Sequence, residues 1–443
     1  MGKRRRRNKV PQGIFQAEIH ALSHEGRGIA QIDGKTTFID NALPGETVEF
    51  SYTGTRSRFD EGTANTILKG SEQRVTPGCE YFGYCGGCSM QHMSPEAQLA
   101  HKQDVLIEQL QHAGKVTPAA VMEPLTGPAW GYRHKARLAV KHVIKKEKTM
   151  VGFREKGSPF VADIASCEVL HPNVGKQFTL LQALINSLSI YNQVPQIEVA
   201  VGDDATALVI RHLAPFTDDD IEKLQAFEQQ HGFRLFLQPG GYDSVERLAG
   251  YNGNSLSYDL PDWKLKLDFL PTDFTQINTA INRSMIARAI DLLELNGDDE
   301  VLDLFCGIGN FTLPMATIAH KVIGVEGDAG LIERARANAA ANAIENVDYH
   351  VANLAADDLV YPFMQQQYNK LLLDPPRTGA KEILSALNLK GIDRIVYVSC
   401  NPATLARDAG ILVNDKGYKL LSAGVMDMFP HTAHVESIAV FAK

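Results

Sequence analysis

The chain has 443 residues, of which 44% are hydrophobic and 22% charged, and its formal net charge is −8. This length suggests about three domains, and the composition is that of a globular protein rather than a disordered or fibrous one. No apolar run approaches the roughly 20 residues that a membrane-spanning helix needs, which excludes an integral membrane protein of that kind. The basic start, residues 1–9, has no apolar segment behind it and so does not resemble a signal peptide; we expect a cytoplasmic protein.

The basic start is the most uneven feature of the charge distribution. Without its six basic residues the chain would have 38 basic against 52 acidic residues. A short basic arm on an acidic body is typical of proteins that touch a polyanion, because each lysine or arginine displaces condensed counterions. A solvated tail without a partner is the alternative. The six residues are Lys3, Arg4, Arg5, Arg6, Arg7 and Lys9.

Short β segments separated by turns follow, from residue 10 to about residue 69. Asp33 and Gly34 form a hairpin signal between two of them. The pattern predicts a small five-stranded barrel, and such barrels often bind single-stranded nucleic acid through a basic, aromatic face. Arg56, Arg58 and Phe59 are candidates for that face, although the barrel could equally be a packing module. The clearest β segments are 14–19, 28–32, 36–39 and 47–52.

Three of the six cysteines, Cys79, Cys85 and Cys88, stand close together, and Cys167 follows much later. In a cytoplasmic protein they should not form disulfides. Bunched thiols in a glycine-rich loop are typical of a metal or cluster site. Zinc normally takes paired Cys-x2-Cys knuckles and only one such pair is present, so an iron-sulfur cluster with Cys167 as fourth ligand is favoured. Four unrelated buried thiols are the alternative, which stays most open for Cys167.

Residues 70–266 read as a central domain of mixed helices and strands. A helix is predicted between Ser94 and Gly114. From residue 132 to 153, basic and apolar residues alternate, which predicts a hairpin with one cationic face. That face would suit phosphates or solvent equally well. Its basic residues are Arg133, Lys135, Arg137, Lys141, Lys145 and Lys146.

From residue 267 onward, strands alternate with helices, which predicts a doubly wound parallel sheet. The last two strands have no helix between them and should form an antiparallel pair at one edge. The expected elements are a helix over 278–293 and strands over 301–305, 321–325, 347–351, 370–373, 394–398, 419–426 and 434–441.

The turn after the first of these strands contains Gly307 and Gly309, which let the backbone approach a ligand at the carboxyl end of the sheet. A dinucleotide site would have a third glycine where Thr312 stands, so NAD is disfavoured. Glu326, at the end of the next strand, is placed to hold two ribose hydroxyls. A shortened glycine turn with an acidic strand end resembles the S-adenosylmethionine site of class I methyltransferases.

Two later strand ends carry further reactive groups. Asp374 precedes two prolines that fix the loop, and Cys400 lies just before a helix whose N-terminal dipole should lower the pKa of the thiol. Carbon 5 of uracil is too weak a nucleophile to take a methyl group, but thiolate addition at carbon 6 makes it electron-rich. A base must then remove the carbon-5 proton, and Glu436, near the start of the last strand, is the candidate. Cys306 is expected to be an inert buried thiol.

The motifs of this chain resemble those of the RNA uracil-C5 methyltransferase family, in the same order and over essentially the whole length. They read DLFCGIGNF at 303–311, DPPR at 374–377, SCNP at 399–402 and HVE at 434–436. The resemblance implies that Cys400 is the nucleophile and Glu436 the proton acceptor. It implies that the pocket for S-adenosylmethionine and uracil is lined by Gln276, Phe305, Asn310, Glu326, Asn353 and Asp374. It also implies that a 4Fe-4S cluster is bound by Cys79, Cys85, Cys88 and Cys167.

The expected fold class is α/β. A class I, Rossmann-like methyltransferase domain over 267–443 would follow a basic arm (1–9), an OB-fold barrel resembling a TRAM domain (10–69) and a central α+β iron-sulfur domain (70–266). The resemblance implies that a chain with both the barrel and the cluster cysteines acts on uridine 1939 of 23S rRNA, so 23S rRNA is the expected partner, with no obligate protein partner. Another 23S rRNA or tRNA uridine stays open, because some members that act at two sites carry both features.

Two other classes of protein were considered. An amino-group methyltransferase would use the Asp374 loop to polarise an exocyclic amine and would need no cysteine. A redox or radical protein would be built around the cluster, but radical S-adenosylmethionine enzymes usually show Cys-x3-Cys-x2-Cys, which leaves one iron open. Here a fourth cysteine is available to close the cluster.

Overall fold

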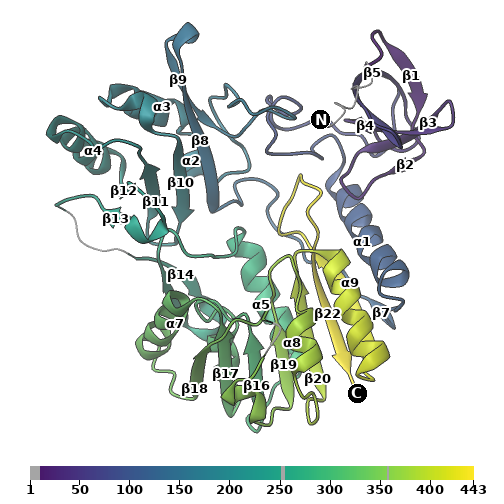
Figure 1. Cartoon of the computed structure of the whole chain (residues 1–443), viewed down its shortest axis with the longest axis vertical. Helices are drawn as coiled ribbons and strands as arrows, with labels where there is room; N and C mark the ends of the chain where they lie inside the picture. Colours follow the sequence, from purple (N-terminus) through teal and green to yellow (C-terminus); the bar gives the residue numbers. More distant parts are fainter. Residues whose placement is uncertain (1–9, 251–254, 357–358) are drawn as a thin grey trace, which may run out of the picture. The chain divides into compact units, whose positions relative to one another are not determined.

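The computed structural model describes residues 10–250, 255–356 and 359–443 (Figure 1). The predicted basic arm, residues 1–9, lies outside the described residues. The chain forms two compact units. The N-terminal unit runs to Lys102 and includes the later segment Phe429–His434, whereas the large unit comprises Gln103–Met428 and Val435–Lys443.

The N-terminal unit contains a six-stranded sheet in the order β1-β5-β6-β4-β3-β2. Only Ile19 and His20 separate β1 from β2, and these two strands pair with opposite edges of the sheet, β5 and β3. Strands β1 and β2 are thus two halves of one interrupted strand that pairs at both ends of the sheet. Counted in this way, the sheet closes into the five-stranded barrel that the sequence predicts. Apolar side chains such as Ile39 and Phe50 fill it. The strands are β1 (Phe15–Glu18), β2 (Ala21–Leu22), β3 (Gly28–Ile32), β4 (Lys35–Asp40), β5 (Thr47–Thr55) and β6 (Phe59–Lys69).

The barrel residues proposed for nucleic-acid contact lie at the turn between β5 and β6. Arg56 and Arg58 are exposed, with 63% of the Arg56 side chain accessible. Phe59 packs edge-on against Phe38, with ring centroids 5.5 Å apart, and the guanidinium carbon of Arg27 lies 4.8 Å from the centre of the Phe38 ring. The two aromatic rings therefore form a supported, cation-flanked pair beside two exposed arginines.

The segment Phe429–His434 packs within the N-terminal unit although the chain before and after it belongs to the large unit. The backbone oxygen of His431 accepts a hydrogen bond from the amide of Met90 at 3.0 Å, and Lys102 donates to the backbone oxygen of Phe429 at 3.0 Å. Lys102 is fully buried, so its bond to Phe429 anchors this segment from inside the unit.

The large unit begins inside helix α1 (Pro95–His112) and contains a six-stranded sheet in the order β13-β12-β11-β10-β8-β9. Strands β8 and β9 form the predicted basic hairpin, but its cations are not equivalent: Arg137 is exposed and bonded to Glu198 at 2.9 Å, whereas Lys135 is only partly exposed and donates to the backbone oxygen of Asp273. The elements are β8 (Lys135–Val143), β9 (Lys148–Gly152), α2 (Pro172–Gly175), α3 (Phe178–Ser187), β10 (Gln196–Val201), β11 (Thr206–Arg211), α4 (Asp218–His231), β12 (Phe233–Gln238), β13 (Glu246–Arg247) and the separate hairpin β14 (Leu256–Leu260) and β15 (Leu265–Phe269).

An eight-stranded sheet, in the order β18-β17-β16-β19-β20-β22-β21-β7, forms the rest of the large unit (Figure 1, green to yellow except for the blue edge strand β7). Strands β18, β17, β16, β19 and β20 run parallel to one another, as predicted. Strand β22 is antiparallel to both β20 and β21, also as predicted. The elements are β7 (Ala120–Val121), α5 (Thr279–Leu293), β16 (Glu300–Leu304), α6 (Thr312–Ala316), β17 (Lys321–Glu326), α7 (Ala329–Ala341), β18 (Val347–Val351), β19 (Lys370–Leu373), α8 (Lys381–Ala386), β20 (Arg394–Ser399), α9 (Pro402–Gly410), β21 (Lys419–Met426) and β22 (Glu436–Ala442).

The core of this sheet is apolar, and the surface is mixed in charge. Central strand residues such as Leu302, Leu371 and Ile395 are fully buried in one continuous cluster.

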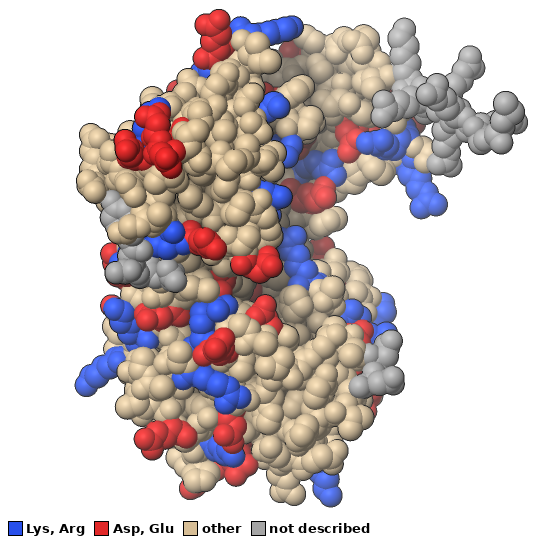
Figure 2. Space-filling view, turned by 60° about the vertical axis from the view of Figure 1, so that its left-hand side comes forward, with Lys and Arg blue, Asp and Glu red and all other residues tan. Residues whose placement is uncertain are grey.

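On the face shown in Figure 2, basic and acidic side chains lie among one another over much of the surface. None of the helices formed by the described residues combines the length and apolar composition required to span a bilayer.

Candidate active site

The parallel strands bring most of the predicted site residues to one edge of the large sheet. In the register of the sheet, Leu304 lies beside both Val325 and Leu373. The residues that follow these three strand positions therefore emerge side by side at the carboxyl ends of the strands, where α/β sheets bind ligands. In strand order these residues are Glu326, Phe305 and Asp374, followed by Cys400 at the end of β20.

Cys400 and Glu436 meet through the antiparallel pairing of β20 with β22. The register places Ser399 opposite Ser437, so that Cys400 and Glu436 occupy the next positions across the pair. Glu436 is 3% exposed, and its carboxyl group and that of Asp374 both act electrostatically on the Cys400 thiol. The structure thus gathers a thiol and two carboxyl groups from three different strand ends.

The backbone of the glycine turn is shaped for close approach. Phe305 adopts a left-handed conformation with φ of 67°, unusual for a bulky residue, and Gly307 has φ of 55°. A side chain built on Gly307 would point into open space. A side chain on Gly309, with φ of 95°, would instead lie 3.1 Å from the hydroxyl oxygen of Tyr349. The first glycine therefore leaves room beside the strand ends, and the second permits tight packing.

Glu326 ties this turn to the neighbouring strand. Its Oε2 accepts a hydrogen bond from the amide of Gly307 at 3.2 Å, and its Oε1 accepts from the amides of Gly327 at 2.6 Å and Asp328 at 3.2 Å. Oε2 retains capacity for another donor, such as a ribose hydroxyl. Asn353, just after β18, is exposed and accepts a bond from the amide of Ala355 at 3.1 Å.

Buried carboxyl groups collect under this edge of the sheet. Burial raises the pKa of Asp374 to about 7, while a hydrogen bond from Gln276 at 3.3 Å partly opposes the shift. Burial also raises the pKa of Asp303 to about 8 and the pKa of Glu436 well above its usual range, and Asp374 adds to both shifts through charge repulsion. A site with several desolvated acids favours a cationic ligand. The positively charged sulfonium of S-adenosylmethionine fits this donor set.

The predicted effect of the helix dipole on Cys400 is wrong. The pKa of the Cys400 thiol is raised to about 11, chiefly by burial and then by repulsion from Glu436 and Asp374, with Arg377 opposing weakly. Helix α9 begins after Asn401, whose side chain already accepts the bond of the Ala403 amide at 3.1 Å. Burial and two adjacent acids outweigh the helix terminus, so the thiol is protonated in the ligand-free protein. Cys306 is 4% exposed, as expected of an inert thiol.

Two polar residues of the site, Tyr258 and Asn282, lie outside the sequence motifs. Tyr258 and Asn282 both hydrogen-bond to Asn310, and the hydroxyl of Thr312 donates to Asp303 at 2.5 Å. Tyr258 lies in the short strand β14, which carries none of the motifs. Asp303 begins the motif at 303–311, and an aspartate inside an otherwise apolar strand was the further hint that it is a buried acid.

The cysteines proposed for a cluster do not form a ready metal site. Cys79, Cys85 and Cys88 lie on a loop of the N-terminal unit, where the amide of Gly87 donates to the Cys85 sulfur at 3.4 Å. Cys167 is buried in the large unit. Soft thiols and an amide donor suit an iron-sulfur cluster. Within the described ranges, however, no group of three or more His, Cys, Asp or Glu side chains is arranged to hold a metal ion, so the cluster stays a prediction.

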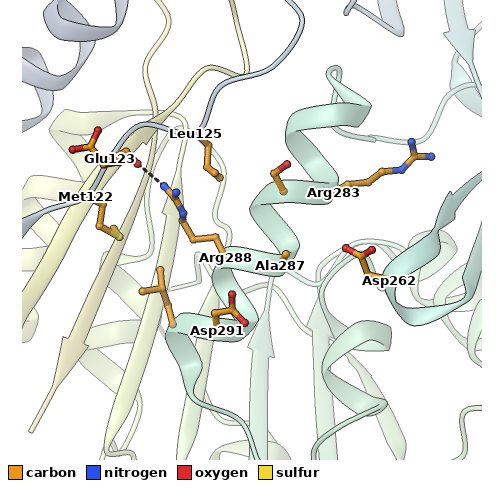
Figure 3. A pocket seen from close by; sticks show the side chains of 10 residues that line it. Met122, Glu123, Leu125, Asp262, Arg283, Ala287, Arg288 and Asp291 are labelled. Carbon is orange, nitrogen blue, oxygen red and sulfur yellow. Dashed lines mark hydrogen bonds between the residues drawn. The ribbon is translucent and has the colours of Figure 1, made fainter.

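A separate cavity of about 590 Å³ lies along α5 (Figure 3) and contains none of the predicted site residues. Figure 3 shows Arg288 reaching from the helix toward the backbone of Glu123, whose oxygen accepts its hydrogen bond at 2.7 Å. Asp262 and Asp291 also line this cavity, so its charge is mixed. We assign it no role in the chemistry at the strand ends.

Comparisons with known proteins match two regions of the chain and its full length. The family described as tRNA (Uracil-5-)-methyltransferase matches residues 255–443, and the TRAM domain matches residues 14–59, which confirms the barrel's predicted type. A protein of Xanthomonas euvesicatoria pv. vesicatoria named 23S rRNA (uracil(1939)-C(5))-methyltransferase RlmD is 52% identical over 99% of both chains. A protein of the same name from Francisella tularensis subsp. novicida is 52% identical over 100% of both chains.

Among solved structures, the tRNA (uracil-54, C5)-methyltransferase of Pyrococcus abyssi, in complex with S-adenosyl-L-homocysteine, has a TM-score of 0.74. The match has 22% identity and covers 97% of this chain and 100% of that one, which shows a shared fold. The full-length identity to the curated relatives goes further than the fold. This chain belongs to the family of RNA uracil-C5 methyltransferases.

Proposed function

We propose that the protein methylates carbon 5 of uridine 1939 in 23S rRNA, with S-adenosylmethionine as methyl donor and 5-methyluridine as product. The identity to relatives named for that reaction supports the substrate. The adjacency of Cys400 and Glu436 across β20 and β22 carries the chemistry, because it supplies a nucleophile and a proton acceptor at one point. The donor supplies an electrophilic methyl group on a sulfonium.

The proposed reaction balances with these two side chains. The Cys400 thiolate adds to carbon 6 of the uracil, and the electron pair of the ring double bond moves toward carbon 5. Carbon 5 takes the methyl group, and the sulfonium becomes a neutral thioether. The Glu436 carboxylate then takes the carbon-5 proton, the double bond re-forms and the thiolate leaves. The target base must leave its stack to reach Cys400, at a cost of a few kcal/mol.

The burial of Cys400 and Glu436 affects when each group loses or gains a proton during the proposed reaction. Without a ligand, the pKa of Cys400, raised to about 11, keeps the thiol protonated near neutral pH, and burial raises the pKa of the Glu436 carboxyl group well above its usual range. A bound sulfonium would lower both pKa values, because a nearby cation favours the charged forms, so both groups would release their protons to solvent before the thiolate adds. Once the methyl group has left, that cation is gone. Glu436 then becomes a stronger base at the step in which it must accept a proton.

The remaining parts receive supporting roles. The chain would divide into four parts, with boundaries after residues 9, 69 and 266. The TRAM barrel and the basic arm would bind the RNA. The protein would act in the cytoplasm. Cys79, Cys85, Cys88 and Cys167 would bind a 4Fe-4S cluster that takes no part in methyl transfer, since the reaction moves no electrons overall. Iron and sulfide analysis of anaerobically purified protein tests this assignment; about four irons per chain support it and an iron-free, active protein would refute it.

Mapping the modified nucleotide tests the proposed function. 23S rRNA from cells with and without the gene would be compared for 5-methyluridine, with complementation by wild-type protein and by Cys400→Ala. The proposal expects the modification at uridine 1939 to disappear with the gene and to return only with wild-type protein. Loss at a different 23S rRNA or tRNA uridine would correct the substrate, and rescue by Cys400→Ala would favour amino-group chemistry.

A further inference from the structure

Asn310, which lies in the motif at 303–311, is held by the side chains of Tyr258 and Asn282, which lie outside the motifs. Its Oδ1 accepts hydrogen bonds from the Tyr258 hydroxyl at 2.8 Å and from Nδ2 of Asn282 at 3.0 Å. Its Nδ2 donates to Oδ1 of Asn282 at 2.9 Å. The two amides thus bond reciprocally. Among the described residues the Tyr258 hydroxyl has no other acceptor, so its proton favours the orientation in which the oxygen of Asn310 faces it.

The two side chains that hold Asn310 are buried. Tyr258 is 7% exposed on β14, and Asn282 is 4% exposed on α5. Burial raises the pKa of the Tyr258 hydroxyl far above its usual value, so the phenol keeps its proton. Two elements outside the glycine turn therefore set the orientation of a side chain within it.

These hydrogen bonds leave Asn310 with one free hydrogen-bond donor for a ligand. An amide oxygen accepts through two lone pairs, and both are occupied; the amide nitrogen has two hydrogens, and one is used. Among the described residues, the second hydrogen has no partner. Asn310 can therefore offer the methyl donor one N–H and no acceptor.

We propose that Tyr258 and Asn282 are positioning residues that lock Asn310 as a hydrogen-bond donor to S-adenosylmethionine. Without them the amide would rotate freely and could present its oxygen, which would repel the ligand's acceptor atoms. This inference rests on the proposed function. It adds that donor affinity depends on two residues that do not themselves touch the donor.

Tyr258→Phe tests this directly, because it removes one oxygen from a packed ring. Tyr368→Phe is the matched control: Tyr368 is also buried in the large unit, and its hydroxyl donates to the backbone oxygen of Phe363 at 2.8 Å. The full-length proteins would be assayed for the Kd of S-adenosylmethionine by calorimetry, and for KM and kcat with saturating RNA.

We expect Tyr258→Phe to raise the Kd and KM for the donor about fivefold to tenfold, the worth of one hydrogen bond, with little change in kcat. Tyr368→Phe should leave both constants unchanged. In an Asn310→Ala background, Tyr258→Phe should have no further effect, because the group that it orients is gone. An equal effect of both tyrosine changes, or an effect of Tyr258→Phe that persists without Asn310, would overturn the inference. If wild-type protein neither binds the donor nor methylates RNA, the proposed function fails instead.

Discussion

Glu436 occupies the position directly across the β20–β22 strand pair from Cys400, at the carboxyl end of β20. The two residues are far apart in the sequence, and a strand register brings them together. A shift of this register by one residue would turn Glu436 to the opposite face of the sheet. The pairing therefore determines which carboxylate can reach the carbon that the thiol activates.

Replacing Glu436 by glutamine should stop the reaction at its last stage. Glutamine cannot accept the carbon-5 proton, so thiol addition and methyl transfer proceed but release does not. We expect turnover to fall by about 10² to 10⁴ and a methylated protein–RNA adduct to accumulate. Denaturing electrophoresis with labelled methyl donor would detect it. Glu345→Gln, a change at an exposed residue, is the control. Lost turnover without any adduct would remove Glu436 from this role.

The reactivity of Cys400 should depend on pH and on the charge of the ligand. Its pKa, raised to about 11, predicts that alkylation by iodoacetamide accelerates as pH rises toward that value, since only the thiolate reacts. S-adenosylmethionine should lower this pKa and speed alkylation at pH 8 by about threefold to tenfold over S-adenosylhomocysteine, which lacks the sulfonium charge. Mass spectrometry of the Cys400 peptide reports the rate. Equal rates with both ligands would contradict the electrostatic account.

The buried acid Asp303 should make the protein less stable as pH rises. Its folded-state pKa is about 8 against a usual 3.8, so between these values the folded state holds a proton that the unfolded chain releases. The free energy of unfolding therefore falls with rising pH across this window, on the order of a few kcal/mol. Asp303→Asn should flatten that fall in urea unfolding at pH 5 and pH 8. Exposed Asp415→Asn should not. An unchanged slope in Asp303→Asn would contradict the assignment.

The sequence allowed strand positions to be predicted well because hydrophobic runs were bounded by turns. The bounds of β18, β19 and β21 are those expected. Strand β22 begins at Glu436, two residues later than predicted, because His434 belongs to the segment that packs in the N-terminal unit. The local pattern of hydrophobic residues does not show that residues 429–434 pack with a unit formed by a distant part of the chain.

The site was predictable where motifs follow strand ends, and not where its properties arise from packing. Cys400 and Asp374 could be selected by their place after strands, whereas the direction of the Cys400 pKa shift depends on burial and on carboxyl groups from other strands. Tyr258 was missed because a tyrosine in a short hairpin has no distinctive local pattern. Its role emerges only when β14 and the glycine turn are seen together.

The covalent bond from Cys400 to the uracil ring is the central claim, and RNA that carries 5-fluorouridine at the target position tests it most directly. Fluorine cannot leave as a proton does, so the reaction should stop with protein and RNA joined. The account predicts that mass spectrometry of the digested complex finds the modified base, methyl group included, on the peptide that contains Cys400. Methyl transfer without any such linkage, or a linkage at a different residue such as Cys306, would contradict it.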